Sequence, residues 1–160
     1  MNHLEIINYL ISKHNYNSYL EIGIGYGDVF AQVNATQKEC CDITDINIIN
    51  DTKITYLMTS DEMFEKIPVD KTYDIIFIDG MHNEEYVDRD IINSLKHLNE
   101  GGCICVHDTI PSNVFMQQNF IPPNEIFNGW TGDVWKSITK LQEQNIEFYT
   151  IVNEDTGLTV

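Results

Sequence analysis

The fold is decided by the stretch Tyr19-Leu20-Glu21-Ile22-Gly23-Ile24-Gly25-Tyr26-Gly27-Asp28. It is typical of a buried strand that contains an acid near its end and then breaks into three alternating glycines. Because glycine accepts positive φ and lets a ligand approach the backbone, such a loop is suited to hold a ligand against main-chain N–H groups. Its G-x-G-x-G spacing differs from the G-x-G-x-x-G of nicotinamide-dependent proteins. Taken alone, the stretch is also compatible with a simple tight turn between a strand and a helix.

The length and the charge of the chain limit the classes of function. At 160 residues, with a formal net charge of −16, it is expected to form one domain, residues 1–160, around one core. The negative charge argues against a nucleic-acid partner and against an anionic membrane surface. No apolar run is long enough to span a bilayer, and the N-terminus does not have the pattern of a secretory leader. We therefore expect a cytoplasmic protein with neither partner.

The four cysteines occur as the pair Cys40-Cys41 and as Cys103-x-Cys105. Neither spacing is that of a structural zinc site, and both lie in apolar, strand-like stretches. We expect small buried thiols that stay reduced.

Hydrophobic periodicity predicts strands and helices in alternation. Strands are expected at 18–22, 38–42, 54–58, 73–78 and 103–106, and residues 146–152 and 157–160 are expected to form a closing hairpin. Helices are expected in the first twelve residues, at 28–34, after Thr59, in the segment up to Leu98, and around residues 134–141. Gly101-Gly102 are expected to end the helix that precedes the fifth strand.

This alternation implies a parallel sheet with right-handed crossovers. The expected fold is α/β, Rossmann-like and doubly wound, with a mostly parallel seven-stranded sheet, helices on both faces and a C-terminal antiparallel hairpin. Residues 109–132 interrupt the pattern with three prolines and with apolar residues such as Phe115, Phe120 and Phe127. Because long loops in compact domains are typically lids or binding loops, we expect this segment to cover a site or to join a homodimer.

Acids and small polar residues follow the predicted strands. The segment 21–27, Asp42, Ser60-Asp61, Asp79 and His107-Asp108 each stand at the end of one strand. Ligands of open α/β sheets bind at the carboxyl ends of the strands. One shared site therefore explains this pattern better than five independent turns.

These residues resemble class I S-adenosylmethionine-dependent methyltransferases, and most closely a subgroup of small Rossmann-like members often associated with glycan modification. The resemblance covers most of the chain. It rests on Glu21-x-Gly23-x-Gly25-x-Gly27, Thr59-Ser60-Asp61-Glu62, Phe77-Ile78-Asp79-Gly80-Met81-His82, His107-Asp108 and Gly132-Asp133-Val134-Trp135-Lys136. It implies S-adenosyl-L-methionine as cofactor and O-methylation of a small-molecule or carbohydrate (glycan) hydroxyl. The chain is short for the family, which is a further reason to expect a homodimer.

The resemblance also implies the roles of individual residues. The loop 23–27 with Glu21 would hold the methionine end of the cofactor, Asp42 the two ribose hydroxyls, and Ser60 with Asp61 the adenine edge. Asp79 would lie beneath the sulfonium. The implied cofactor-binding residues are Glu21, Gly23, Gly25, Tyr26, Gly27, Asp42, Ser60, Asp61 and Asp79.

The candidate catalytic residues are Asp79, His82, His107 and Asp108. Histidine titrates near neutral pH, so His82 or His107 is a candidate base for the acceptor hydroxyl, and a histidine base is the interpretation that we favour. Alternatively, Asp79 and Asp108 hold Mg²⁺, which would lower the pKa of that hydroxyl. Metal-dependent catechol-type methyltransferases, which the pattern distantly resembles, have an amide where this chain has Thr109. The remaining histidines, His3, His14 and His97, are expected away from the site.

Two other functions compete with methyl transfer. One is a cofactor-binding protein of the same fold that does not catalyse and acts as a regulatory or scaffold partner. The other is a nicotinamide-dependent oxidoreductase, which the glycine spacing and the lack of a second nucleotide-binding half disfavour.

Overall fold

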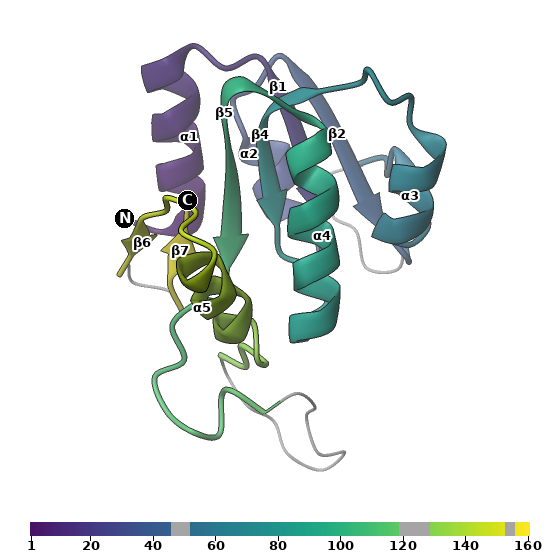
Figure 1. The fold of residues 1–160 in the computed structure, drawn as a ribbon. Coiled ribbons are helices and arrows are strands. Elements are labelled where there is room, and N and C mark those ends of the chain that lie inside the picture. The colour runs from purple at the N-terminus through teal and green to yellow at the C-terminus, as the bar shows by residue number, and fades with distance from the viewer. Residues whose placement is uncertain (46–51, 119–128, 153–155) are drawn as a thin grey trace.

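The computed structural model describes residues 1–45, 52–118, 129–152 and 156–160 (Figure 1). Within these residues the strands form a seven-stranded sheet in the order β3-β2-β1-β4-β5-β7-β6. In chain order the elements are α1 (His3–His14), β1 (Ser18–Ile22), α2 (Asp28–Gln32), β2 (Gln37–Asp42), β3 (Tyr56–Leu57), α3 (Ser60–Lys66), β4 (Tyr73–Ile78), α4 (Glu84–Lys96), β5 (Leu98–His107), α5 (Trp135–Glu143), β6 (Thr150–Ile151) and β7 (Leu158–Thr159).

The sheet is parallel from β3 to β5 and antiparallel at its β7–β6 edge. The predicted α/β fold with a C-terminal antiparallel hairpin is therefore confirmed. The strands of this hairpin, β6 and β7, have two residues each and are shorter than predicted. Residues 153–155, which lie between the two predicted hairpin strands, are outside the described residues.

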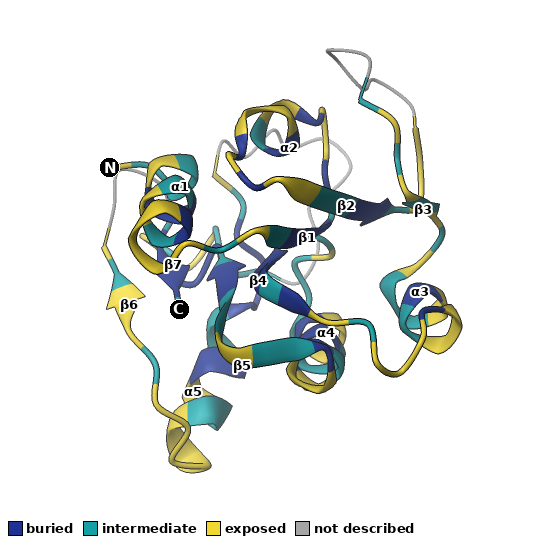
Figure 2. Cartoon of the chain, turned by 90° about the horizontal axis from the view of Figure 1, so that it is seen from above, coloured by how far each residue is buried: buried dark blue, intermediate teal, exposed yellow. Residues whose placement is uncertain are grey.

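Helices cover both faces of the sheet. Figure 2 shows α1 and α2 on one side and α3, α4 and α5 on the other. Successive strand residues point to opposite faces, so Tyr19 packs with the residues of α1 and α2, whereas Leu20 packs with those of α3, α4 and α5. Because central parallel strands are buried on both faces, β4 reads as a nearly continuous apolar run. The carboxyl ends of β1, β2 and β4 are thereby brought to one edge.

The structure corrects the boundary between α4 and β5. Gly101 and Gly102 lie inside β5, and α4 already ends at Lys96. The backbone N–H of Tyr73 donates to the carbonyl of His97 at 2.8 Å, which draws the chain into the sheet before the glycines. The register with β4 then shifts between Tyr73 and Ile75. A Cβ on Gly102 would lie 2.6 Å from the Asp74 carbonyl oxygen, so glycine is needed for strand contact rather than for a helix end.

Two helix starts follow directly from the sequence. Asn2 and Thr59 each form a capping box, with Glu5 and Glu62 respectively. In contrast, β3 contains only Tyr56–Leu57 and is shorter than the predicted strand 54–58.

All four cysteines are free thiols.

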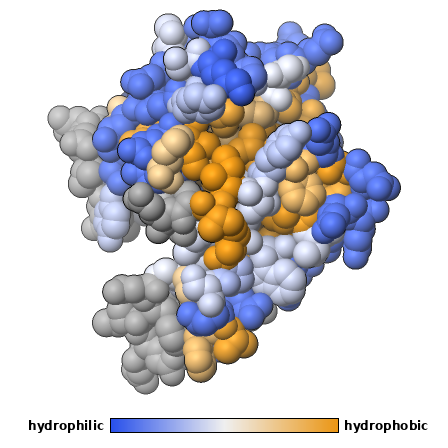
Figure 3. Space-filling model, turned by 90° about the vertical axis from the view of Figure 1, so that its left-hand side faces the viewer, coloured by the Kyte–Doolittle hydropathy of each residue, from blue (hydrophilic) through white to orange (hydrophobic). Residues whose placement is uncertain are grey.

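The outer surface is mixed in polarity. Figure 3, which views the side where α1 and β6 lie, shows hydrophobic side chains surrounded by hydrophilic ones. Tyr149 and Val152, next to β6, are 68% and 82% exposed. The homodimer remains a prediction. Among the described helices, none has the length and apolar character needed to cross a membrane.

Candidate active site

A pocket of about 650 Å³ lies at the carboxyl ends of β1, β2, β3 and β4. Its volume is in the range of small-molecule sites, roughly 300–1,000 Å³. The lining comes from the segments that follow these strands and from α4. The predicted cofactor-binding residues among the lining are Gly23, Gly25, Tyr26, Asp42, Ser60, Asp61 and Asp79. Glu21 and Gly27 do not line it.

The glycine loop is held against the ends of two strands. The N–H of Gly23 donates to the Cys41 carbonyl at 2.9 Å, and that of Gly27 donates to the Ile24 carbonyl at 2.6 Å. Gly23 has φ +80°, and a Cβ there would lie 2.4 Å from the carbonyl oxygen of Asp79. The loop can therefore reach the end of β4 only if residue 23 is glycine.

Glu21 lies beneath this loop rather than in the pocket. Its side chain is buried and accepts a hydrogen bond from the Tyr19 hydroxyl. Burial raises the pKa of Glu21 to about 8, with smaller contributions in the same direction from Asp79 and Asp28. The hydrogen bond from Tyr19 and the charge of Lys38 oppose this shift, so burial is what favours the neutral form of the carboxyl under the loop.

Asp42 connects the end of β2 to the glycine loop. Its Oδ2 accepts the N–H of Ile24 at 2.9 Å, and its Oδ1 accepts the N–H of Thr44 at 3.1 Å. These hydrogen bonds fix the carboxylate where it lines the pocket. The predicted position of this acid is thus matched by the structure.

The structure adds Asp90, a carboxyl that our sequence reasoning missed, to the β3 side of the pocket. Asp90 lies on α4, lines the pocket and is only 3% exposed. The nearby Asp61, which was predicted, is paired with Arg89, whose Nε lies 3.0 Å from Asp61 Oδ2. Burial raises the pKa of Asp90 to about 6; the Ser60 hydrogen bond and the charge of Arg89 oppose the shift, whereas the charge of Asp61 adds to it. The sequence shows an acid on a predicted helix, but it does not show which face of that helix meets the pocket, so Asp90 could not be assigned to the site.

The pKa of Asp90 predicts a pH-dependent stability difference. Because this pKa is higher in the folded than in the unfolded chain, protonation stabilises the fold, and that stabilisation is lost as the pH rises through about 6. A shift from 3.8 to about 6 corresponds to about 3 kcal/mol at about 1.4 kcal/mol per pH unit. Wild type should therefore lose up to about 3 kcal/mol of unfolding free energy through this group between about pH 4 and pH 8, whereas Asp90→Asn, which lacks the carboxyl, should not. Urea titrations of both proteins at both pH values measure the difference in unfolding free energy between them. The same difference at pH 4 and at pH 8 would contradict the prediction.

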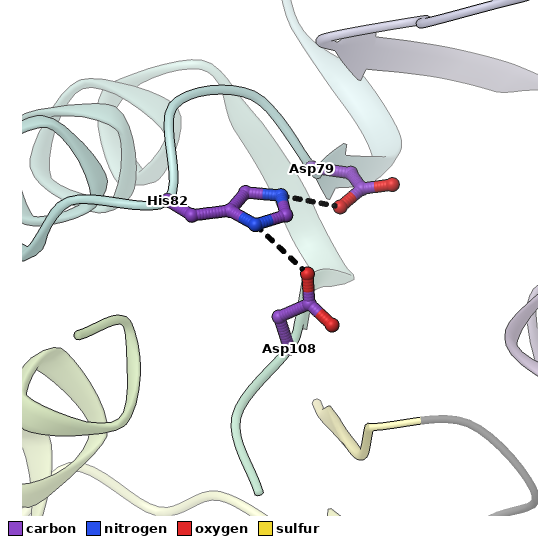
Figure 4. Close-up of side chains that lie close together, drawn as sticks. All are labelled: Asp79, His82 and Asp108. Carbon is purple, nitrogen blue, oxygen red and sulfur yellow. Dashed lines mark ion pairs between the residues drawn. The ribbon is translucent and has the colours of Figure 1, made fainter. Parts of the chain in front are cut away.

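Four predicted catalytic residues meet at the ends of β4 and β5. The Nδ1 of His82 lies 3.1 Å from Asp108 Oδ2, and its Nε2 lies 3.5 Å from Asp79 Oδ1. Figure 4 shows the imidazole of His82 between the two carboxylates. The Nδ1 of His107 lies 3.1 Å from Asp79 Oδ1, and its Nε2 is buried. Asp79 thus contacts both histidines and also lines the pocket.

The charges in this cluster stabilise one another. Burial opposes ionisation of Asp79, but hydrogen bonds and charges of His107 and His82 hold the pKa of its carboxyl well below the usual range. Burial acts to lower the pKa of His82, yet the hydrogen bond with Asp79 and the charges of Asp108 and Asp79 keep this pKa above its ordinary value. Burial raises the pKa of Asp108, against the opposing charges of His107 and His82.

The segment before α5 supports His82 from the other side. The backbone N–H of Asp133 donates to the His82 carbonyl at 3.2 Å, and a Cβ on Gly132 would lie 1.6 Å from that same oxygen. The Trp130 ring stacks on the His82 ring with centroids 5.0 Å apart. Part of the predicted lid therefore contacts the cluster, whereas Phe120 and Phe127 lie outside the described residues.

His3 is placed beside the cluster, contrary to our prediction for the histidines outside it. Its ring centroid lies 4.4 Å from that of His107 and 5.8 Å from that of Phe77. It is the first residue of α1, and the packing of α1 on the sheet brings it there. Helical periodicity shows which face of α1 is apolar but not which strand end its first turn meets.

The donor set of the cluster fits a divalent cation. One ligand atom each from Asp79, His82 and Asp108 lies within 4.8 Å of the others. Two carboxylates suit Mg²⁺ or Mn²⁺, and the imidazole favours the latter. Thr109, which replaces the amide of catechol-type enzymes, instead has its hydroxyl 3.1 Å from that of Thr159.

A doubly wound sheet with a glycine loop after β1 and a carboxylate at the end of β2 defines the Rossmann-like class of fold. Residues 20–109 match the family described as a methyltransferase domain, and the chain belongs to that family. The match begins in β1 and ends just after Asp108. It therefore spans the whole pocket lining and all four members of the cluster, and the resemblance to class I S-adenosylmethionine-dependent methyltransferases is confirmed.

Solved structures share this fold. A Staphylococcus aureus protein assigned as a caffeoyl-CoA O-methyltransferase is 20% identical, with a TM-score of 0.66 over 98% of this chain and 80% of its own. A Bacillus cereus O-methyltransferase in complex with S-adenosylhomocysteine is 12% identical, with a TM-score of 0.64 over 98% and 78%. MycE, a methyltransferase of mycinamycin biosynthesis in complex with Mg and S-adenosylhomocysteine, is 15% identical, with a TM-score of 0.57 over 97% and 48%. A search of curated protein sequences gave no match.

Proposed function

We propose that this protein is an S-adenosylmethionine-dependent methyltransferase that methylates a hydroxyl oxygen of a small molecule or carbohydrate. The observation that carries the proposal is the position of Asp79, which lines the pocket and contacts both His82 and His107. A cofactor in the pocket would end beside groups able to accept a proton. The Bacillus cereus structure and MycE, which both contain S-adenosylhomocysteine, support this choice of cofactor.

The residues of the pocket suit this cofactor chemically. Asp79 keeps its negative charge, which favours a sulfonium nearby. Asp42 presents a carboxylate held by two backbone N–H groups, which suits a pair of ribose hydroxyls. When bound, S-adenosylmethionine supplies a methyl group activated by the positive sulfur. The protein contributes position and the removal of the acceptor proton.

Removal of Asp42 should weaken cofactor binding. Asp42→Ala is expected to cost about 2 kcal/mol or more, roughly 30-fold in the dissociation constant of S-adenosylhomocysteine, because two charge-assisted hydrogen bonds are lost together. Calorimetry measures this. Asp45→Ala is the control, since Asp45 is exposed and does not line the pocket. Unchanged affinity in a folded Asp42→Ala protein would mean that the ribose binds elsewhere.

We propose that the Nε2 atom of His82 takes the proton of the acceptor hydroxyl. His82 Nδ1 already faces Asp108 Oδ2 and the Trp130 carbonyl, each at 3.1 Å, so Nε2, 3.5 Å from Asp79 Oδ1, is the nitrogen left to accept a proton when the imidazole is neutral. His107 has its Nδ1 on Asp79 and its Nε2 buried, so it orients Asp79 rather than meeting the acceptor. The imidazole would take the proton of the hydroxyl while the methyl group moves from the sulfonium to that oxygen, so that the sulfur–methyl bond breaks and S-adenosylhomocysteine and a protonated histidine remain.

A divalent cation is the alternative means of activation. Asp79, His82 and Asp108 would hold it, and it would lower the pKa of the acceptor hydroxyl. The Mg reported in MycE favours testing this route.

The proposed function is tested with radiolabelled S-adenosylmethionine and a panel of glycans and phenols. Transfer to an oxygen of at least one acceptor is the expected result. A second measurement follows thermal stability with S-adenosylhomocysteine, since a ligand at a hundred times its dissociation constant adds about 2.7 kcal/mol. Binding without transfer to any acceptor would favour the non-catalytic, cofactor-binding alternative. Absence of binding would overturn the proposal.

A further inference from the structure

Asp108 has a backbone conformation that needs support from its surroundings. Its φ is +58°, in the left-handed region that residues other than glycine seldom adopt, and its side chain is only 6% exposed. The other described non-glycine residues with positive φ are Asn15 and Asn145, which follow the ends of α1 and α5, where this conformation is common. Asp108 instead follows a strand. Residues in such conformations persist where neighbouring groups hold them, and they occur mostly at functional sites.

The chain that enters β7 holds the backbone on both sides of Asp108. Before it, His107 lies opposite Leu158 in the antiparallel pair of β5 and β7. After it, the backbone N–H of Ile110 donates to the Thr156 carbonyl at 2.7 Å. The turn at Asp108 is therefore fixed at both ends by β7 and by the residue two positions before it.

Thr156 also holds the carboxyl group of Asp108. Its hydroxyl donates a hydrogen bond to Oδ1, whereas the other oxygen, Oδ2, lies 3.1 Å from His82 Nδ1. Figure 4 shows one carboxyl oxygen directed at the His82 ring and the other turned away from it. The Nδ1 of His107 lies 3.7 Å from Oδ1, too far for a hydrogen bond. The two oxygens of Asp108 thus have different partners, one from each side.

The hydrogen bond from Thr156 determines how Asp108 meets His82. With Oδ1 held, the carboxylate cannot turn freely about its last bond, so Oδ2 stays opposite Nδ1 of the imidazole. An acceptor fixed at Nδ1 keeps the ring proton on that nitrogen when the imidazole is neutral, and Nε2 is then the nitrogen that takes up a proton.

We propose that Thr156 is a positioning residue for methyl transfer, which holds Asp108 through its hydroxyl and its backbone carbonyl so that Oδ2 faces His82. This rests on the proposed function. It applies to both means of activation, because Asp108 orients His82 in one and would hold the cation in the other. Thr156 lies beyond residues 20–109, which match the methyltransferase family, so this role falls to a part of the chain that the family match does not include.

The test compares Thr156→Val, which keeps the shape of the side chain and removes the hydroxyl, with Thr156→Ser, which keeps the hydroxyl. We expect Thr156→Val to lower kcat by roughly tenfold to a hundredfold, as the loss of a group that orients a site residue typically does. The KM for S-adenosylmethionine should stay within about twofold, because Thr156 does not line the pocket. Thr156→Ser should restore most of kcat. The matched control is Thr139→Val, which removes a hydrogen-bonded hydroxyl from an exposed position on α5 and should leave kcat unchanged.

The state of His82 gives a readout that needs no acceptor. At a pH where the ring is neutral, proton–nitrogen NMR correlations across the imidazole show which nitrogen carries the proton, and His82→Gln assigns the signal. Wild type and Thr156→Ser should hold the proton on Nδ1. Thr156→Val should populate both tautomers, because Oδ2 is no longer fixed opposite Nδ1.

The outcomes separate the role of Thr156 from the proposed function. If wild type methylates an acceptor and Thr156→Val keeps the wild-type kcat and a single tautomer, the role is overturned while the proposed function stands. An equal loss of kcat in Thr156→Val and Thr156→Ser would also overturn it, because the hydroxyl would then not be responsible. If wild type binds S-adenosylhomocysteine but no acceptor is found, a single His82 tautomer in Thr156→Val overturns the role.

Two further results are decided in the same way. If wild type neither binds S-adenosylhomocysteine nor methylates any acceptor, the proposed function fails, and the role of Thr156 in methyl transfer fails with it. Should Thr156→Val not fold, Thr156→Ala takes its place, and an unchanged kcat in that variant overturns the role.

Discussion

His82→Gln is expected to lower the turnover number by roughly a hundredfold or more, as is typical when general-base catalysis is lost. The amide of glutamine can occupy the position between Asp79 and Asp108 but cannot take up a proton. The affinity for S-adenosylhomocysteine should stay within about twofold, because His82 does not line the pocket. The matched control is His14→Gln, an exposed histidine at the end of α1, which should leave turnover unchanged.

Chelation separates the two means of activation. A histidine base survives treatment with a chelator, whereas a metal route collapses, returns with Mg²⁺ or Mn²⁺, and is lost in Asp108→Asn. The assay is methyl transfer from radiolabelled S-adenosylmethionine to an acceptor found in the panel. Full activity of a His82→Gln, His107→Gln double variant that remains sensitive to the chelator would mean that a metal held by Asp79 and Asp108 without His82 replaces the histidine base.

Gly23→Ala should be the most destabilising single substitution in the glycine loop. The new Cβ would lie 2.4 Å from both the Asp79 carbonyl oxygen and the Gly80 Cα, and φ is +80°. Neither contact can relax by a side-chain rotation, because both atoms belong to the backbone. A loss of about 3 kcal/mol or more in the free energy of unfolding follows from the overlap and the strained backbone. The displaced Asp79 would also disturb the cluster.

Gly25→Ala is the control in the same loop. A Cβ there meets nothing within 4 Å, although φ is +49°, so we expect a loss of only about 1 kcal/mol. Because Gly25 lines the pocket, the same methyl group should still weaken the binding of S-adenosylhomocysteine. Chemical denaturation and calorimetry on both variants separate the two effects. Equal stabilities of Gly23→Ala and Gly25→Ala would mean that the loop does not pack against the end of β4 as described.

Much of this architecture follows from local sequence. The alternation of apolar runs with amphipathic stretches predicts β1, β2, β4 and the helices between them, because strand and helix periodicities are properties of consecutive residues. The capping box at Thr59 likewise depends only on residues three positions apart. Asp42, Asp79 and Asp108 could be assigned to one site, since the carboxyl ends of parallel strands share one edge of a sheet.

Other features depend on packing between segments far apart in the chain. Gly101 and Gly102 read as a helix end, but the contact with Asp74 on β4 places them inside β5. His3 and Asp90 both lie on helices, and only the seating of α1 and α4 on the sheet brings His3 to His107 and Asp90 to Ser60. The sequence by itself thus determined the class of fold and the site residues that stand at the ends of strands. The residues that helices bring to the site, His3 and Asp90, were decided by the tertiary structure. The reason is that a helix can turn about its axis and slide along the sheet until side-chain packing sets its position.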